Sequence, residues 1–189
     1  MRRWTSIAAV LVVTAMGASA FASVPTDLHR AHHRTQCTIT GTSDWDRLNG
    51  TSADDVICGR GGGDIITGAK GKDILRGGNG DDLLRGGYGS DLLRGANGGD
   101  SIRGGSGADR IVSRLGWDRL YGGGGHDTFY AGSGHDCLES KEGVRDVLQG
   151  GAGEDYSYSD RGHGDRPKDV RSNIEHEVAF CPEPEGPVS

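Results

Sequence analysis

Aspartate recurs every nine residues through most of this chain of 189 residues. The series consists of Asp46, Asp55, Asp64, Asp73, Asp82, Asp91, Asp100, Asp109, Asp118, Asp127 and Asp136. Two residues after each aspartate stands an apolar side chain, from Leu48 to Leu138. One inserted residue between Ser140 and Arg145 shifts the phase, and Asp146 and Asp155 then resume it. A fixed period of this kind indicates one backbone unit stacked on copies of itself.

Glycine accounts for 35 residues, and only 33% of the chain is hydrophobic. Such a composition alone would suggest disorder. The glycines share the nine-residue period, however, so they indicate a repeated turn geometry. The net charge is −6, and 20 of the 27 acidic residues are aspartate, most of them in the glycine-rich repeats. This pattern suits hard cations and predicts no nucleic-acid partner.

The best units are Gly77 to Arg85 (GGNGDDLLR) and Gly86 to Arg94 (GGYGSDLLR). They resemble the calcium-binding nonapeptide G-G-x-G-x-D-x-U-x of the repeats-in-toxin family (RTX, haemolysin-type). The resemblance covers about residues 41–158.

Each unit predicts a turn of six residues followed by a strand of three, whose middle apolar side chain faces inward. Two units then complete a coil of about 18 residues, and coils stack at the inter-strand spacing of about 4.8 Å. The sequence therefore predicts an all-β fold, a right-handed parallel β-roll with short caps at its ends.

Stacking places each aspartate above the one 18 residues away, in two columns of carboxylates that repel one another. A divalent cation between them reverses the sign of that interaction. Ca²⁺ accepts six to eight oxygens in loose geometry, whereas Mg²⁺ requires a tighter octahedron, so we expect Ca²⁺. Because the apolar core is thin, we also expect metal binding to be linked to folding.

The RTX resemblance implies that the ligands are the sixth-position aspartates and backbone carbonyls of the glycine-rich turns. The aspartates are Asp64, Asp73, Asp82, Asp91, Asp100, Asp109, Asp127 and Asp136. Their turns begin at Gly59, Gly68, Gly77, Gly86, Gly95, Gly104, Gly122 and Ala131. Weak or missing sites are expected beside Asp46, Asp55 and Asp118, whose turns depart from the pattern. We expect about five to eight ions.

The chain divides into four segments. Residues 1–22 have the features of a signal peptide: a basic start, a short apolar run and A-x-A-like cleavage sites that place the mature start at Phe21 or Ser23. Residues 23–40 are a polar leader and N-terminal cap, 41–158 the roll, and 159–189 a C-terminal cap and tail. No further apolar stretch predicts a membrane span, so we expect a secreted protein.

Four cysteines in an exported chain indicate two disulfides, with three possible pairings. Stacking puts Cys58 and Cys137 on opposite faces and about 20 Å apart, which exceeds the Cα limit of about 7 Å and removes one pairing. We favour Cys37–Cys58 with Cys137–Cys181, one disulfide at each end; free thiols are the alternative.

Two sets of side chains face outward on the predicted strands. Arginine holds the ninth position at Arg76, Arg85, Arg94 and Arg103, and either binds an acidic polysaccharide or balances the nearby aspartates. Apolar residues hold the seventh position at Val56, Ile65, Ile74, Leu83 and Leu92. They form either a partner surface or a strip covered by the arginine stems.

No catalytic motif is complete. His176-Glu177 begins an H-E-x-x-H pattern, but Phe180 stands where the second histidine belongs, and no G-x-S-x-G occurs. The sequence therefore predicts a calcium-binding repeat protein without enzymatic activity. The alternative is a Ca²⁺-dependent adhesin with a cell-surface polysaccharide or protein as partner.

Overall fold

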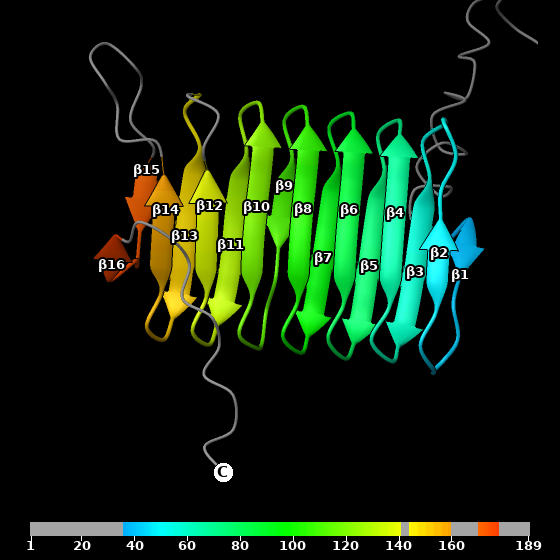
Figure 1. Ribbon diagram of the computed structural model, residues 1–189, viewed down its shortest axis with the longest axis horizontal. Helices are drawn as coiled ribbons and strands as arrows, with labels where there is room; N and C mark the ends of the chain where they lie inside the picture. The colour runs from blue at the N-terminus through cyan, green and yellow to red at the C-terminus, as the bar shows by residue number, and fades with distance from the viewer. Residues whose placement is uncertain (1–35, 141–143, 160–169, 178–189) are drawn as a thin grey trace, which may run out of the picture.

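The structure, a computed structural model, describes residues 36–140, 144–159 and 170–177. Over these residues the chain forms only β-strands, all paired in parallel, in two sheets that face each other (Figure 1). Successive strands alternate between the sheets, so each strand pairs with the strand two places further along the chain. This confirms the predicted all-β parallel roll with two units in each coil.

Eight strands form each sheet. The first sheet contains β1 (Ile39–Thr40), β3 (Val56–Gly61), β5 (Ile74–Asn79), β7 (Leu92–Asn97), β9 (Arg110–Val112), β11 (Thr128–Ser133), β13 (Val147–Ala152) and β15 (Val170–Ser172). The second contains β2 (Arg47–Asn49), β4 (Ile65–Lys70), β6 (Leu83–Tyr88), β8 (Ser101–Ser106), β10 (Arg119–Gly124), β12 (Cys137–Ser140), β14 (Tyr156–Ser159) and β16 (His176–Glu177).

The register follows the sequence period. Leu75 pairs with Leu93, and Leu84 pairs with Ile102, each 18 residues on. Beyond the inserted residue the offset becomes 19, as Phe129 pairs with Leu148. The phase shift read from the sequence is therefore confirmed.

A single file of apolar side chains from each sheet fills the space between the sheets. These side chains stand two residues after the repeating aspartates and are fully buried: Ile57, Ile66, Leu75, Leu84, Leu93, Ile102, Ile111, Leu120, Phe129, Leu138 and Leu148. Ile39, Leu48 and Ile174 pack against the file at its two ends and are only partly buried. The core is thus one side chain thick on each side along the whole stack.

The strands are longer than the sequence predicts. Most have six residues, because the first three residues of each glycine-rich segment continue the ladder and leave a turn of only three residues. The second position achieves this with a positive φ, at glycine in Gly78 (127°) and at other residues in Arg60 (89°) and Ala96 (96°). Strand β9 is shorter than its neighbours in the stack: it ends at Val112, where Ser113 and Arg114 replace the glycine pair.

The N-terminal end is fastened to the first full strand. Cys37 and Cys58 form the predicted disulfide, with Cα atoms 5.9 Å apart. The Thr38 hydroxyl donates to the Val56 carbonyl at 3.0 Å, and Val56 is only 6% exposed. Val56 precedes the buried Ile57 and so points outward, as predicted, but the entering chain covers it and it is not open to solvent.

At the other end, Cys137 lies in the sheet opposite Cys58, as predicted, and is disulfide-bonded. Its predicted partner Cys181 lies outside the described residues, as do Val178, Phe180 and the segment 1–22. Strands β15 and β16, which follow residue 158, extend both sheets. Within the described residues, no helix has the length and apolar character needed to cross a membrane.

Candidate metal centre

The repeating aspartates form two ladders along the two edges of the roll, where the chain turns from one sheet to the other. In each ladder, the backbone N–H of one aspartate donates to Oδ1 of the aspartate in the next coil, for example Asp64 to Asp82 at 2.7 Å and Asp73 to Asp91 at 2.8 Å. These hydrogen bonds run along the axis of the roll, so a backbone N–H of the preceding coil holds each carboxylate in place. The predicted columns are therefore present.

The second oxygen of these carboxylates has no donor. Oδ2 is buried without a hydrogen-bond partner in Asp64, Asp73, Asp82, Asp91, Asp100, Asp109, Asp118, Asp127, Asp136 and Asp155. A buried carboxylate oxygen without a partner is costly. One such oxygen in nearly every turn is a systematic feature of this roll, and it requires a common explanation.

Burial raises the pKa of these carboxyl groups. Burial raises the pKa of Asp100 to about 8; the N–H of Asp82 opposes this shift, and repulsion from Asp118, Asp82 and Asp81 adds to it. Burial also raises the pKa to about 7 in Asp109 and Asp136 and to about 6 in Asp73, Asp82 and Asp127. The pKa is raised in the same direction in Asp64, Asp91, Asp118 and Asp155. Without a counter-charge, several of these side chains would retain a proton near neutral pH.

The first-position glycines leave room for this carboxylate. A Cβ added at Gly68 would meet Oδ2 of Asp73 and the carbonyl oxygen of Gly86 in the next coil, the latter at 2.7 Å. Gly59 has the same surroundings, with Asp64 and the carbonyl of the next coil. The positive φ angles lie at the second and fourth positions, so the first position needs glycine for space and not for its φ.

The site thus contains a carboxylate oxygen beside each first-position glycine of the complete turns. At Gly59, Gly68, Gly86 and Gly104 a backbone carbonyl oxygen of the next coil lies there as well. Among the described residues, no three histidine, cysteine, aspartate or glutamate side chains converge on one point. A cation held here must therefore take most of its ligands from the backbone. Oxygen-only, loosely arranged ligands are those that Ca²⁺ accepts and Zn²⁺ does not favour. The residues present fit a calcium ion.

In the first two turns, a threonine donates hydrogen bonds to the Oδ2 atom that has no donor elsewhere. Oδ2 of Asp46 accepts from the N–H and the hydroxyl of Thr42, at 2.6 and 2.9 Å. Oδ2 of Asp55 accepts from the same groups of Thr51, at 2.7 and 2.9 Å. Threonine at the second position therefore supplies the donors that the other turns lack.

Asp118 does not share this arrangement. Its turn lacks the first two glycines, yet its carboxylate is as buried as the others and its Oδ2 has no partner. The weaker binding expected beside Asp118 stays a prediction, and the geometry of the carboxylate gives no reason for it.

Three further acidic groups complete the ladders and were not among the predicted ligands. Asp146 accepts from the N–H of Asp127 at 2.8 Å, Asp155 from Asp136 at 3.0 Å, and Glu175 from Asp155 at 2.8 Å. For Asp155 the signal was present in the sequence, since Gly150-Gly151-Ala152-Gly153 precedes it. Glu175 has no such turn and lies 20 residues on, so its place could not be counted from the period.

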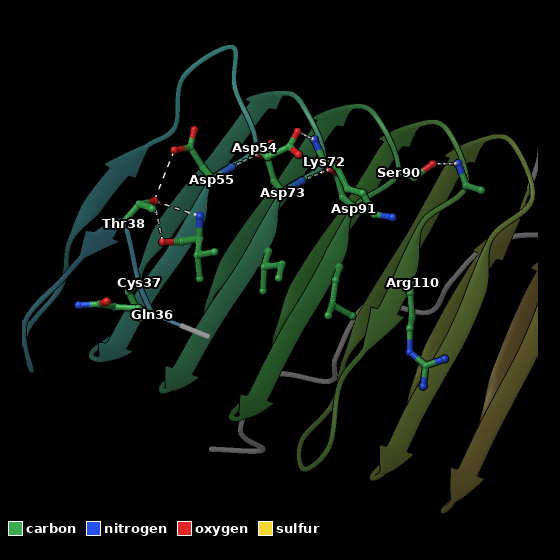
Figure 2. A pocket seen from close by; sticks show the side chains of 14 residues that line it. Gln36, Cys37, Thr38, Asp54, Asp55, Lys72, Asp73, Ser90, Asp91 and Arg110 are labelled. Carbon is green, nitrogen blue, oxygen red and sulfur yellow. Dashed lines mark hydrogen bonds between the residues drawn. The ribbon is translucent and has the colours of Figure 1, made fainter. Parts of the chain in front are cut away.

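The ladder that contains Asp55, Asp73 and Asp91 borders a groove of about 640 Å³ on the outside of the first sheet (Figure 2). Asp55, Asp73 and Asp91 follow one another along it, with Thr38 at one end and Arg110 at the other. This part of the ladder therefore lies next to open space, although each carboxylate is itself buried.

Comparison with protein families matches most of the roll to one family model, described as the RTX calcium-binding nonapeptide repeat (4 copies). The matched segments are residues 40–75, 67–102, 76–111, 112–143 and 145–164. No curated protein matches the chain.

Proposed function

The chain belongs to the RTX calcium-binding nonapeptide repeat family, and from this premise we propose that it is a secreted protein whose roll folds when it binds several Ca²⁺ ions. The observation that carries the proposal is the set of buried Oδ2 atoms without donors, one in nearly every turn from Asp64 to Asp155. A ladder of this kind is unfavourable as bare carboxylates and favourable once cations bind between its rungs.

The residues that would hold the ions are the predicted aspartates of complete turns, together with the backbone carbonyls of those turns. Asp155 joins them, because its turn has the glycines and its Oδ2 is buried in the same way. Asp46 and Asp55 do not, because Thr42 and Thr51 already satisfy their Oδ2 atoms. When bound, Ca²⁺ supplies positive charge and accepts oxygen ligands; the number proposed remains about five to eight.

The thin core supports the link to folding. Each unit buries one apolar side chain fully, worth about 1.5–3 kcal/mol, whereas ordering the backbone of nine residues costs about 1–2 kcal/mol for each residue. Backbone hydrogen bonds offset part of this difference, and metal binding is proposed to supply the remainder.

Secretion is proposed on two grounds. The segment 1–22, which lies outside the described residues, has the features of a signal peptide. The disulfide between Cys37 and Cys58 is consistent with an oxidising compartment. Mass spectrometry of the protein recovered from culture medium tests this: a chain that starts at Phe21 or Ser23 is expected, and a chain that retains Met1 would contradict it.

The proposed role is binding rather than catalysis. RTX rolls are typically structural or binding modules, and the sequence carries no complete catalytic motif. A Ca²⁺-dependent adhesin is the second candidate, favoured by exposed arginines on both sheet faces, at Arg85 and Arg94.

A calcium titration followed by circular dichroism and calorimetry tests the proposal. We expect little β-structure in metal-free protein near neutral pH and a cooperative gain as Ca²⁺ is added. Asp82→Asn keeps the Oδ1 acceptor for Asp64 but removes the charge, so the number of bound ions should fall. Asp81→Asn is the matched control, because Asp81 is exposed and lies outside the ladder. The same β-rich spectrum with EDTA and with millimolar Ca²⁺, or equal ion numbers in the two variants, would refute the proposal.

A further inference from the structure

Two pairs of arginines stand in register on the outer faces of the roll. Arg76 of β5 pairs with Arg94 of β7 on the first sheet, and Arg85 of β6 pairs with Arg103 of β8 on the second. Each follows a fully buried leucine or isoleucine in its strand, so its side chain points away from the core. Arg85, Arg94 and Arg103 are exposed. The roll therefore carries one basic pair at the centre of each face.

These pairs are electrostatically unbalanced within the part of the chain that the structure describes. Residues opposite each other on neighbouring strands are about 4.8 Å apart, and like charges in that position repel. No carboxylate among the described residues forms an ion pair with Arg76, Arg85, Arg94 or Arg103. The guanidinium of Arg103 instead lies 5.5 Å from the ring centre of Tyr121, and Nε of Arg76 is buried without an acceptor. Neither observation involves an aspartate; the alternative that these arginines balance nearby aspartates at longer range stays a prediction.

Calcium binding would make the two faces dominate the charge of the molecule. The full chain has a formal charge of −6, and loss of Arg2 and Arg3 with the signal peptide makes it −8. Each ion adds two positive charges, so five ions would change the charge of the mature chain to about +2. The charge that the ions cancel lies in the buried ladders along the edges, whereas the arginines stay at the surface. Folding also sets the spacing of the arginines, which an unfolded chain does not have.

We propose that the calcium-loaded roll binds an acidic polysaccharide along its faces, through Arg76 and Arg94 on one side and Arg85 and Arg103 on the other. This inference rests on the proposed function, because it requires the metal-loaded fold. Guanidinium groups bind carboxylate and sulfate oxygens in pairs and are less strongly hydrated than ammonium groups. A polysaccharide with an anionic group on each sugar presents charges at a repeat close to the rung spacing.

The shape of each face favours a narrow chain over a nucleic-acid duplex. A strand of six residues is about 20 Å long, and exposed carboxylates border the faces at the turns, at Asp54 and Asp81. A single polysaccharide chain that crosses the strands lies over the arginines and between these acidic borders. A duplex is broader and would bring its phosphates close to them.

Binding to immobilised heparin in millimolar Ca²⁺ tests the proposal, with neutral dextran as the blank. Arg76→Gln with Arg94→Gln, and separately Arg85→Gln with Arg103→Gln, should each weaken binding about tenfold or more, and the fourfold variant should abolish it. Lys70→Gln with Lys72→Gln is the matched control, since it removes the same charge from two exposed residues outside the pairs and should change affinity less than about twofold.

Three results would overturn the proposal: an equal loss in the lysine variant, equal binding by metal-free protein, or binding of single-stranded DNA as tight as that of heparin. Circular dichroism and a calcium titration on the same samples separate the two proposals. A variant that folds with Ca²⁺ but shows no loss of heparin affinity contradicts only the polysaccharide site, whereas a wild-type chain that does not respond to Ca²⁺ contradicts both.

Discussion

Without calcium, the stability of the roll should fall as the pH rises. Asp100 is the clearest case, because burial raises its pKa from 3.8 to about 8 in the folded chain. In the unfolded chain the same carboxyl returns to the ordinary value, so at intermediate pH the folded state holds a proton that the unfolded state has released. The resulting stabilisation is fully present below about pH 3.8 and is lost as the pH rises through about 8.

The size of the effect follows from the shift. One pKa unit corresponds to about 1.4 kcal/mol, so at about pH 7.5 Asp100 alone disfavours the metal-free fold by about 5 kcal/mol relative to acid conditions. Typical domains have only about 5–15 kcal/mol of total stability. Asp109 and Asp136, with pKa values raised to about 7, act in the same direction. We therefore expect metal-free protein to be unfolded near neutral pH and to gain β-structure on acidification to about pH 4.

Circular dichroism of protein passed over a chelating resin, recorded between about pH 4 and pH 8, measures this directly. Asp100→Asn retains an acceptor for the N–H of Asp82 but cannot ionise, so its metal-free transition should move to higher pH. Asp44→Asn is the control and should leave the transition where it is, because Asp44 is exposed and is not among the groups that raise the pKa of Asp100. The reasoning is refuted if metal-free protein has the same β-structure at both pH values, or if acid removes structure that is present at neutral pH.

Three further changes test the packing and the turns. Gly77→Ala should destabilise the calcium-loaded roll by about 1–3 kcal/mol in denaturant unfolding, because its Cβ would meet the Asp82 carboxylate, whereas Gly124→Ala, whose Cβ meets nothing within 4 Å, should be nearly neutral; equal losses would contradict this account of the first position. Thr51→Gly with Ala53→Gly restores a complete turn and should raise the ion number by one in calorimetry, and an unchanged number would count against threonine as the substitute for metal. Leu93→Ala should cost about 2–5 kcal/mol, and a smaller loss would show that the core carries little of the stability.

The sequence predicted the features that follow from the nine-residue period alone. A period of nine with alternating sides determines the 18-residue register, the buried file from Ile57 to Leu148, and the two aspartate ladders. The register, the buried file and the ladders are repeated in every coil, so irregular units do not alter them. The stacking also removed the Cys58–Cys137 pairing on distance, and the favoured Cys37–Cys58 disulfide is present.

Features that depend on local backbone geometry or on single side chains could not be predicted from the nine-residue period. The strands extend to six residues because the second position takes a positive φ even in Arg60 and Ala96, which the glycine pattern does not foretell. Thr51 donates to Asp55 through a contact that only the folded turn creates. Glu175 reaches the ladder through its longer side chain from a segment without the glycine pattern.

The threonine-containing turns make the two ends of the stack unlike. At the N-terminal end the carboxylates of Asp46 and Asp55 are satisfied within their own turns, and a disulfide joins the entering chain to β3 (Val56–Gly61). We therefore expect those turns to form before any ion arrives and to present an edge to which later coils add. Assembly of the roll would then have a direction, from the end that needs no metal toward the end that does.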